Sequence, residues 1–193
     1  AVTGEINKQR IWKNSEASSG DLIILTKSLG TGIIASGIKK ELVSKKDIKI
    51  AIDSMSTLNK NAANILKQFN PSAVTDISGF GLLGHLKEVC ENSKVTAEIE
   101  FSKLKFLPGV HSLANSGVIP GGTRRNYDYV KAFCEFNSTL STLDHLLASD
   151  AQTSGGLLIA LNETEAKEFM YAYEDSSIIG TIKPKSEKLI SVI

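Results

Sequence analysis

The sequence is poor in cysteine and has no long apolar run, and each shortage excludes a class of protein. Its two cysteines, Cys90 and Cys134, lie far apart with no second Cys or His at ligand spacing, which argues against a disulfide framework and against a zinc site. Two reduced thiols are typical of a cytoplasmic protein, and we expect that location. The longest apolar runs, residues 22–25 and 155–161, are far shorter than the roughly 18 to 20 residues of a membrane span.

The sequence also has little net charge and no recognisable leader. Its 22 Lys and Arg residues nearly balance 21 Asp and Glu residues, so the formal net charge is +1. A general nucleic-acid-binding protein carries a basic excess, and we therefore expect neither a nucleic-acid nor a membrane partner. Residues 1–5 lack an initiator Met, a basic segment and an apolar segment, which argues against a signal peptide. We interpret this start as a cut through a longer chain.

What is present is the pattern of a globular domain in which strands and helices alternate. Hydrophobic residues make up 41% and charged residues 22% of the 193 residues, which is ordinary for one folded domain. Residues 1–19 show little apolar periodicity and are predicted to be a connector, whereas residues 20–193 are predicted to form a layered α/β domain. Apolar spacing predicts strands at 21–27, 95–101 (half-exposed), 157–161, 178–182 and 189–193 (an edge strand). It predicts helices at 33–43, 44–69 (long or broken), 82–92, 108–114, 140–147 and 164–173. Residues 119–126 are predicted to form a loop.

The stretch from Ala73 to His85 combines a short strand, a polar turn and a helix that begins among glycines. Gly79, Gly81 and Gly84 match the G-x-G-x-x-G spacing of a dinucleotide-binding turn. In such a turn a pyrophosphate approaches bare backbone N–H groups, and a carboxylate about 4 Å away would oppose it by about 4 kcal/mol per charge pair. Because Asp76 precedes these glycines, a phosphate bound here would need a cation beside it.

Three interpretations of this stretch stay open on the residues alone. Asp76 before a helix N-terminus fits a metal and phosphate site, because Mg²⁺ is commonly held by one or two carboxylates together with phosphate oxygens. A dinucleotide turn keeps some support from Glu98 and Glu100, which follow the glycines by about 20 residues and could bind a ribose. The third interpretation is a structural glycine turn in which an Asp or Ser is the N-cap of the helix.

A second polar loop, Asp150 to Gly156, runs directly into the strand predicted at 157–161. Its seven residues offer an acid, an amide, two hydroxyls and two glycines. Such a loop could line a polar ligand, or it could form a capped turn. Because both polar loops lie at strand junctions, together they favour a shared pocket.

Four ordered motifs resemble the selenophosphate synthetase (selenide, water dikinase) family and, more broadly, the C-terminal half of the aminoimidazole ribonucleotide synthetase superfamily. They are residues 20–32 (GDLIILTKSLGTG), 73–85, 121–126 (GGTRRN) and 150–157 (DAQTSGGL), and the resemblance covers essentially the whole chain. Ser28 and Ala151 stand where the family usually has Pro. Because Pro mainly fixes φ, we expect these departures to affect loop geometry rather than chemistry.

The resemblance implies a three-layer α/β (α+β) domain, partly ferredoxin-like, that residues 1–19 connect to a separate N-terminal ATP-binding domain. Members of the family are two-domain homodimers that convert ATP, selenide and water to selenophosphate, AMP and phosphate with Mg²⁺. Their reactive Cys or selenocysteine and its Lys belong to the N-terminal domain. We therefore expect no catalytic residue in this chain, and we expect the fragment alone to be inactive. The alternatives are a purine-type or thiamine-phosphate-type enzyme of the superfamily, and a non-catalytic docking module.

The resemblance also implies roles for individual residues. The family position that matches Asp76 helps to hold Mg²⁺, so Asp76 is the predicted metal ligand. The residues predicted to lie near the ATP phosphates are Thr75, Ser78, Gly79 and Gly81. The residues predicted to line the same cleft are Lys27, Asp150, Gln152, Thr153, Ser154 and Gly155.

Four further residues receive structural interpretations. His85 is interpreted as a packed or capping residue rather than one that faces a ligand. At most one of Arg124 and Arg125 is expected to be functional, because adjacent side chains do not easily face one ligand. Trp12 is expected to anchor the connector on the domain or on its partner.

Overall fold

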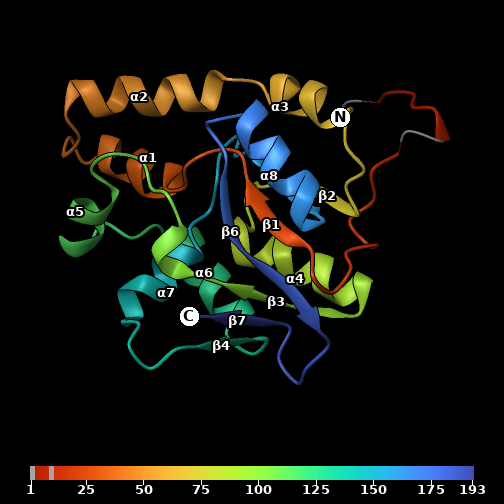
Figure 1. Cartoon of the computed structure of the whole chain (residues 1–193). Coiled ribbons are helices and arrows are strands. Elements are labelled where there is room, and N and C mark those ends of the chain that lie inside the picture. Colours follow the sequence, from red (N-terminus) through yellow and green to blue (C-terminus); the bar gives the residue numbers. More distant parts are fainter. Residues whose placement is uncertain (1–2, 9–10) are drawn as a thin grey trace.

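The computed structural model describes residues 3–8 and 11–193, and a seven-stranded sheet runs through its centre (Figure 1). The strand order is β2-β5-β1-β6-β3-β7-β4. Neighbouring strands are antiparallel except that β7 pairs in parallel with both β3 and β4. The strands are β1 (Leu22–Leu25), β2 (Ala73–Asp76), β3 (Val95–Ile99), β4 (Cys134–Phe136), β5 (Leu157–Leu161), β6 (Ser177–Pro184) and β7 (Ile190–Val192).

The helices fill most of the chain between the strands. None of the helices in the described part of the chain has the length and apolar character needed to cross a membrane. The helices are α1 (Thr31–Lys39), α2 (Lys45–Ser56), α3 (Lys60–Leu66), α4 (Gly81–Ser93), the 3₁₀ helix η2 (Phe101–Lys103), α5 (Val110–Asn115), α6 (Gly121–Val130), α7 (Thr142–Ala148) and α8 (Glu163–Ala172).

Strands β1 and β5 are apolar at every position because helices cover both faces of the sheet. Side chains alternate between the two faces along a strand. Ile23 and Leu158 therefore belong to the cluster that includes α4, whereas Ile24 and Ile159 belong to the cluster that includes α3 and α8. A third cluster lies among α1, α2, α5 and α7 (Figure 1). The two covered faces confirm the predicted three-layer α/β domain.

Two predictions for strands near the β4 edge of the sheet are wrong. The strand at 95–101 was expected to be half-exposed, but four of the five residues of β3 are buried, because β3 lies between β6 and β7. The strand at 189–193 was expected at an edge, but β7 lies between β3 and β4. The strand at this edge of the sheet is β4, whose three residues are too few to give a periodic signal.

The prediction of a loop at 119–126 is also wrong, because most of these residues belong to α6. Pro120 is the N-cap residue, and the helix continues through Gly121 and Gly122. Burial of Thr123 and Val130, which are 0% and 1% exposed, selects the helix in spite of the local turn signal. The pattern at 44–69 is resolved as two helices, α2 and α3, so the broken alternative is confirmed.

Residues 11–17 pack on the domain beside β2. The backbone N–H of Val74 donates a 2.9 Å hydrogen bond to the carbonyl oxygen of Lys13. Trp12 packs against the cluster that includes α3 and α8, and Ala17 is buried in the cluster that includes α4. Trp12 therefore anchors this segment on the domain. That residues 1–19 connect to a further domain stays a prediction.

Candidate functional site

Asp76 is the last residue of β2, the edge strand beside β5, and its Cα partner is Leu157. The next residue, Ile77, is fully buried, and its backbone N–H donates a 2.9 Å bond to the carbonyl oxygen of Gly156. Ser78 to Phe80 then turn the chain into α4. The structure thus forms the strand, polar turn and helix that the sequence predicts.

The three glycines of the G-x-G-x-x-G motif have different surroundings. Gly81 has a φ of 70°, and a Cβ at this position would lie 2.7 Å from the carbonyl oxygen of Asp150. A Cβ at Gly84 would lie 2.8 Å from the Cβ of Phe80. Gly79 is exposed and has open space around it. Gly81 and Gly84 therefore allow close packing, and Gly79 presents bare backbone to solvent.

His85 holds the turn in place from the first part of α4. Its Nε2 accepts a 3.1 Å hydrogen bond from the backbone N–H of Ser78 and lies 3.1 Å from the Ser78 hydroxyl. An accepting Nε2 assigns the proton of the neutral ring to Nδ1. His85 is only 8% exposed, in agreement with its interpretation as a packed residue. The N-cap of α4 is Phe80, which has no side-chain cap bond, so the Asp or Ser N-cap of the third interpretation is not formed.

The carboxylate of Asp76 is exposed and has no hydrogen bond or ion pair with another described residue. It lines a cavity of about 860 Å³, to which Val74 and Thr75 of β2 also contribute. Apolar and aromatic side chains form much of the wall. The lining includes Trp12, Phe69, Asn70, Val74, Thr75 and Leu157.

A single free carboxylate fits one specific kind of metal site. In residues 3–8 and 11–193 there is no cluster of three or more His, Cys, Asp or Glu side chains that could hold a metal ion. Mg²⁺ is often bound by only one or two carboxylates, with phosphate oxygens and waters as the other ligands. Asp76 therefore fits Mg²⁺ as one ligand of a site that needs oxygen atoms from elsewhere.

Asp150 and Gln152 lie in the interior and hold the beginning of α1. Oδ2 of Asp150 accepts hydrogen bonds of 3.1 and 3.2 Å from the backbone N–H groups of Gly32 and Ile33. Oε1 of Gln152 accepts bonds of 3.1 and 3.2 Å from the N–H groups of Gly30 and Thr31. The first N–H groups of a helix have no partner within the helix, so these two side chains supply the cap for α1.

Burial raises the pKa of Asp150 to about 6. Asp150 is 1% exposed, and desolvation disfavours the charged form of its carboxyl group. Hydrogen bonds from Thr123, Ile33, Gly32 and Gln152 favour the charged form and oppose this change. The carboxyl group of Asp150 therefore caps the beginning of α1 and can also titrate.

We expect the stability contributed by Asp150 to decrease as pH rises through about 6. Its folded pKa is about 6, above the unfolded value of about 3.9. The folded state therefore holds the proton more tightly between these values, and this stabilisation disappears at higher pH. The difference corresponds to about 3 kcal/mol at most. Urea unfolding from about pH 4 to pH 7 should show this decrease relative to Asp150→Asn, which cannot titrate. Equal pH slopes for both proteins would contradict the expectation.

The turn at Thr153 to Gly155 contacts both the Asp76 segment and α1. The backbone N–H of Gly155 donates to the carbonyl oxygen of Ile77 at 3.1 Å, and the N–H of Gln152 donates to that of Ser78 at 3.0 Å. The N–H of Thr153 donates to the hydroxyl of Thr31 at 2.8 Å. The structure therefore brings the two predicted loops into direct contact, and a cleft-lining role for the residues of this turn stays a prediction.

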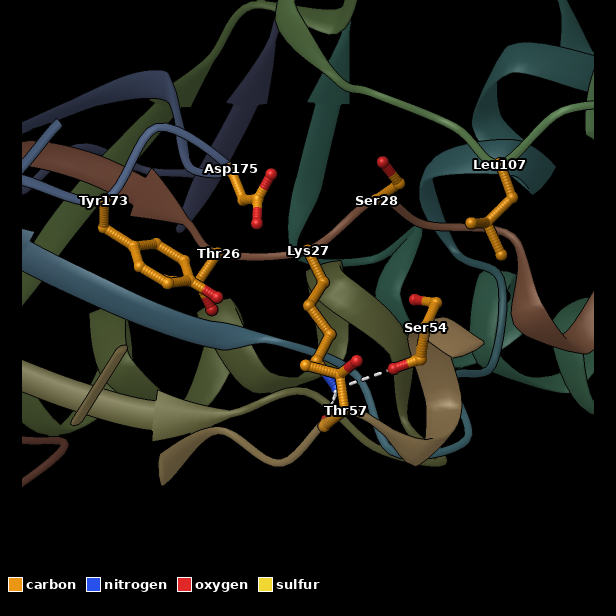
Figure 2. A pocket seen from close by; sticks show the side chains of 8 residues that line it. All are labelled: Thr26, Lys27, Ser28, Ser54, Thr57, Leu107, Tyr173 and Asp175. Carbon is orange, nitrogen blue, oxygen red and sulfur yellow. Dashed lines mark hydrogen bonds between the residues drawn. The ribbon is translucent and has the colours of Figure 1, made fainter. Parts of the chain in front are cut away.

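Lys27 lies two residues beyond the end of β1. It lines a separate cavity of about 210 Å³, where its side chain extends toward the backbone of Ser54 and Thr57 (Figure 2). Its Nζ also donates to the carbonyl oxygen of Ser154 at 2.8 Å. Burial lowers the pKa of Lys27. The structure thus places Lys27 with backbone carbonyl groups, apart from the cavity beside Asp76.

Asn126 is a contact residue that the sequence interpretation did not select. Its Nδ2 donates to the carbonyl oxygens of Gly79 and Ser149, at 2.9 and 3.2 Å, and so links α6 to the turn before α4. Its position in the GGTRRN motif was the available signal.

Arg124 and Arg125 are both exposed on α6. Cys90 and Cys134 are buried, and desolvation raises the pKa of each thiol to about 12.

Comparison with known proteins shows the family of this chain. Residues 18–192 match the family described as "AIR synthase related protein, C-terminal domain". The chain is 39% identical over 197 residues to the selenide, water dikinase of Aliarcobacter butzleri (strain RM4018), an alignment that covers 100% of this chain and 57% of that protein. It is 40% identical over 185 residues to the selenide, water dikinase of Campylobacter jejuni subsp. jejuni serotype O:2, covering 96% of this chain and 53% of that protein. The chain therefore spans little more than half the length of these relatives.

A solved structure supports the fold independently. E. coli HypE, a hydrogenase maturation protein, superposes with a TM-score of 0.70 at 16% identity, covering 98% of this chain and 50% of that chain. Identity this low indicates a shared fold and carries no statement about activity. The sequence match over residues 18–192 and the shared architecture lead to one conclusion. This chain belongs to the AIR synthase related protein, C-terminal domain family.

Proposed function

We propose that this chain is the C-terminal domain of an ATP-dependent selenide, water dikinase, which converts ATP, selenide and water to selenophosphate, AMP and phosphate. The observation that carries the proposal is the identity of 39 to 40% with curated selenide, water dikinases over nearly the whole chain. Because the chain spans just over half of those proteins, the remaining half is proposed to supply an N-terminal ATP-binding domain and the reactive Cys or selenocysteine. The complete enzyme is proposed to be a cytoplasmic homodimer.

In this proposal Asp76 is one ligand of a Mg²⁺ ion whose other ligands come from the N-terminal domain and from ATP. The free, exposed carboxylate at the edge of a large cavity supports this role. The ion would neutralise charge on the phosphate oxygens and orient them. Asp76 itself would position the ion relative to β2, while the buried residue that follows it, Ile77, fixes the backbone.

Gly79 is proposed to be the phosphate-facing residue of the glycine motif. Its backbone is exposed, whereas the N–H of Gly81 already donates to the carbonyl oxygen of Ser78 at 3.0 Å. The N–H of Ser78 is likewise used by His85. Thr75 lines the cavity beside Asp76 and would lie near the same phosphates. The proposed role of these residues is to bind and orient phosphate. Cys90 and Cys134 are both buried, so neither is proposed as the reactive thiol.

The product pattern tests the proposed reaction. We expect the full-length protein to consume ATP only when selenide is present, and to release AMP and orthophosphate. Chromatographic separation of AMP from ADP, with phosphorus NMR of selenophosphate, provides the measurement. Thiamine monophosphate is the matched alternative substrate, because the sequence left a thiamine-phosphate-type enzyme open. Formation of ADP with that substrate, and no response to selenide, would contradict the proposal.

A further inference from the structure

The ammonium group of Lys27 is fully occupied by three backbone carbonyl groups. Nζ donates to the carbonyl oxygens of Ser54, Thr57 and Ser154 at 3.0, 2.6 and 2.8 Å. A lysine ammonium has three protons, so each bond uses one of them. Ser54 and Thr57 lie at the C-terminal end of α2, where carbonyl groups lack helical partners and the helix dipole favours a cation. Figure 2 shows the side chain of Lys27 beside Ser54 and Thr57. With its third bond, to Ser154, Lys27 joins the end of α2 to the turn that contains Ser154.

Asn59 forms a second link between the same two segments. It lies in the connection between α2 and α3, and its Nδ2 donates to the carbonyl oxygen of Gly155 at 2.9 Å. Ser154 has a φ of 50°, in the left-handed region that a residue with a side chain seldom adopts. A Cβ at Gly155 would lie 2.5 Å from the carbonyl oxygen of Ile77. The links therefore hold a turn whose backbone is both unusual and closely packed.

This turn is bonded to the residues that directly follow Asp76. The N–H of Gly155 donates to the carbonyl oxygen of Ile77 at 3.1 Å, and the N–H of Ile77 donates to that of Gly156 at 2.9 Å. β2 is an edge strand, with β5 as its neighbour in the sheet. The backbone at Asp76 thus depends on the turn and on the start of β5 for its position.

We propose that Lys27 is a positioning residue for Asp76, acting through the Ser154–Gly155 turn with the help of Asn59. Lys27 does not contact phosphate in this arrangement, since its ammonium protons are used and it lines a different cavity from Asp76. The inference rests on the proposed function of Asp76 as a Mg²⁺ ligand. It connects the position of Asp76 to the end of α2 through the Ser154–Gly155 turn.

The test uses Lys27→Met in the full-length protein, because methionine keeps the apolar stem and removes the three bonds. Changes around a metal ligand typically alter metal affinity by about 10- to 100-fold. Because Lys27 acts through a turn, we expect the Mg²⁺ concentration for half-maximal ATP consumption to rise by about 10-fold, with little change in kcat at saturating Mg²⁺. Hydrogen exchange should become faster in peptides that cover residues 73–78 and 152–157. Lys27→Arg, which keeps the charge and donors, should restore part of the metal dependence.

Lys105→Met is the control. Lys105 is an exposed lysine that also donates to a backbone carbonyl group, that of Ser176 at 3.2 Å. Its bond is to a segment outside the turn, so it should leave the Mg²⁺ dependence unchanged. Lower stability of Lys27→Met with an unchanged Mg²⁺ dependence would show a purely structural lysine and overturn the inference.

Two further variants keep the inference testable. If Lys27→Met does not fold, Asn59→Ala removes the second link and should raise the Mg²⁺ requirement in the same direction by a smaller factor. An unchanged requirement in Asn59→Ala would then overturn the inference. Asp76→Asn separates this outcome from failure of the proposed function. An inactive Asp76→Asn with a normal Lys27→Met refutes only the positioning role, whereas an active Asp76→Asn refutes the metal-ligand role on which it rests.

Discussion

Replacement of Asp76 by asparagine in the full-length protein should reduce Mg²⁺-dependent ATP consumption by about 1,000-fold, because a metal ion contributes several kcal/mol of transition-state stabilisation. Asparagine keeps the size of the side chain and removes the charge that would bind the cation. The free energy of unfolding should stay nearly unchanged, since the Asp76 carboxylate has no protein partner among the described residues. Steady-state assays over a range of Mg²⁺ concentrations and urea unfolding measure the two effects separately.

Asp128→Asn is a suitable control for that experiment. Asp128 is exposed on α6 and pairs with Lys131 at 2.6 Å, outside the segments around Asp76. An exposed pair of this kind contributes little to stability, so the variant should keep full activity. Retained activity in Asp76→Asn would remove Asp76 from the metal site, and an equal loss in both variants would show that the effect is not specific to position 76.

Replacement of Gly81 by alanine should lower the free energy of unfolding by about 3 kcal/mol, the sum of left-handed backbone strain and overpacking. Gly81 has a φ of 70°, and the new Cβ would lie 2.7 Å from the carbonyl oxygen of Asp150 and 2.9 Å from that of Ser149. Both contacts are with backbone atoms, which cannot rotate away as a flexible side chain would. Urea unfolding of the 193-residue chain measures the loss.

Gly79→Ala is the matched comparison within the same motif. Nothing lies within 4 Å of a Cβ built at Gly79, so the stability of this variant should equal that of the original chain. In the full-length enzyme, however, Gly79→Ala should weaken ATP binding if phosphate approaches this backbone. Equal stability losses in Gly79→Ala and Gly81→Ala would contradict the different roles assigned to the two glycines.

The secondary structure was predictable where local periodicity and burial agree. The apolar runs of β1 and β5 and the spacing of Leu82, Leu83 and Leu86 indicate elements that are buried in the folded chain. The prediction failed where contacts between residues far apart in the sequence determine the secondary structure. Pro120 and two glycines indicate a loop, yet burial of Thr123 and Val130 against the rest of the domain favours α6. β4 escaped prediction because its three residues are too few to give a periodic signal.

The candidate site was predictable as a set of segments but not as a set of contacts. Asp76 and the loop at Asp150 to Gly156 were both selected, and the structure brings their segments together. The interior position of Asp150 was not foreseen, because its partner Gly32 lies 118 residues away in the chain. The pairing of Lys27 with Ser154 spans 127 residues. No local pattern distinguishes an aspartate that caps a distant helix from one that faces a ligand.

The sequence by itself determined the family motifs, the alternation of strands and helices, and the position of one carboxylate before a glycine-rich turn. These features depend on residues within a few positions of one another, which a linear pattern records. Only the tertiary structure decided that Asp76 stays free while Asp150 is enclosed, and that Gly81 packs on backbone while Gly79 faces solvent. The physical reason is that burial and hydrogen-bond partners are set by segments that meet only when the sheet forms.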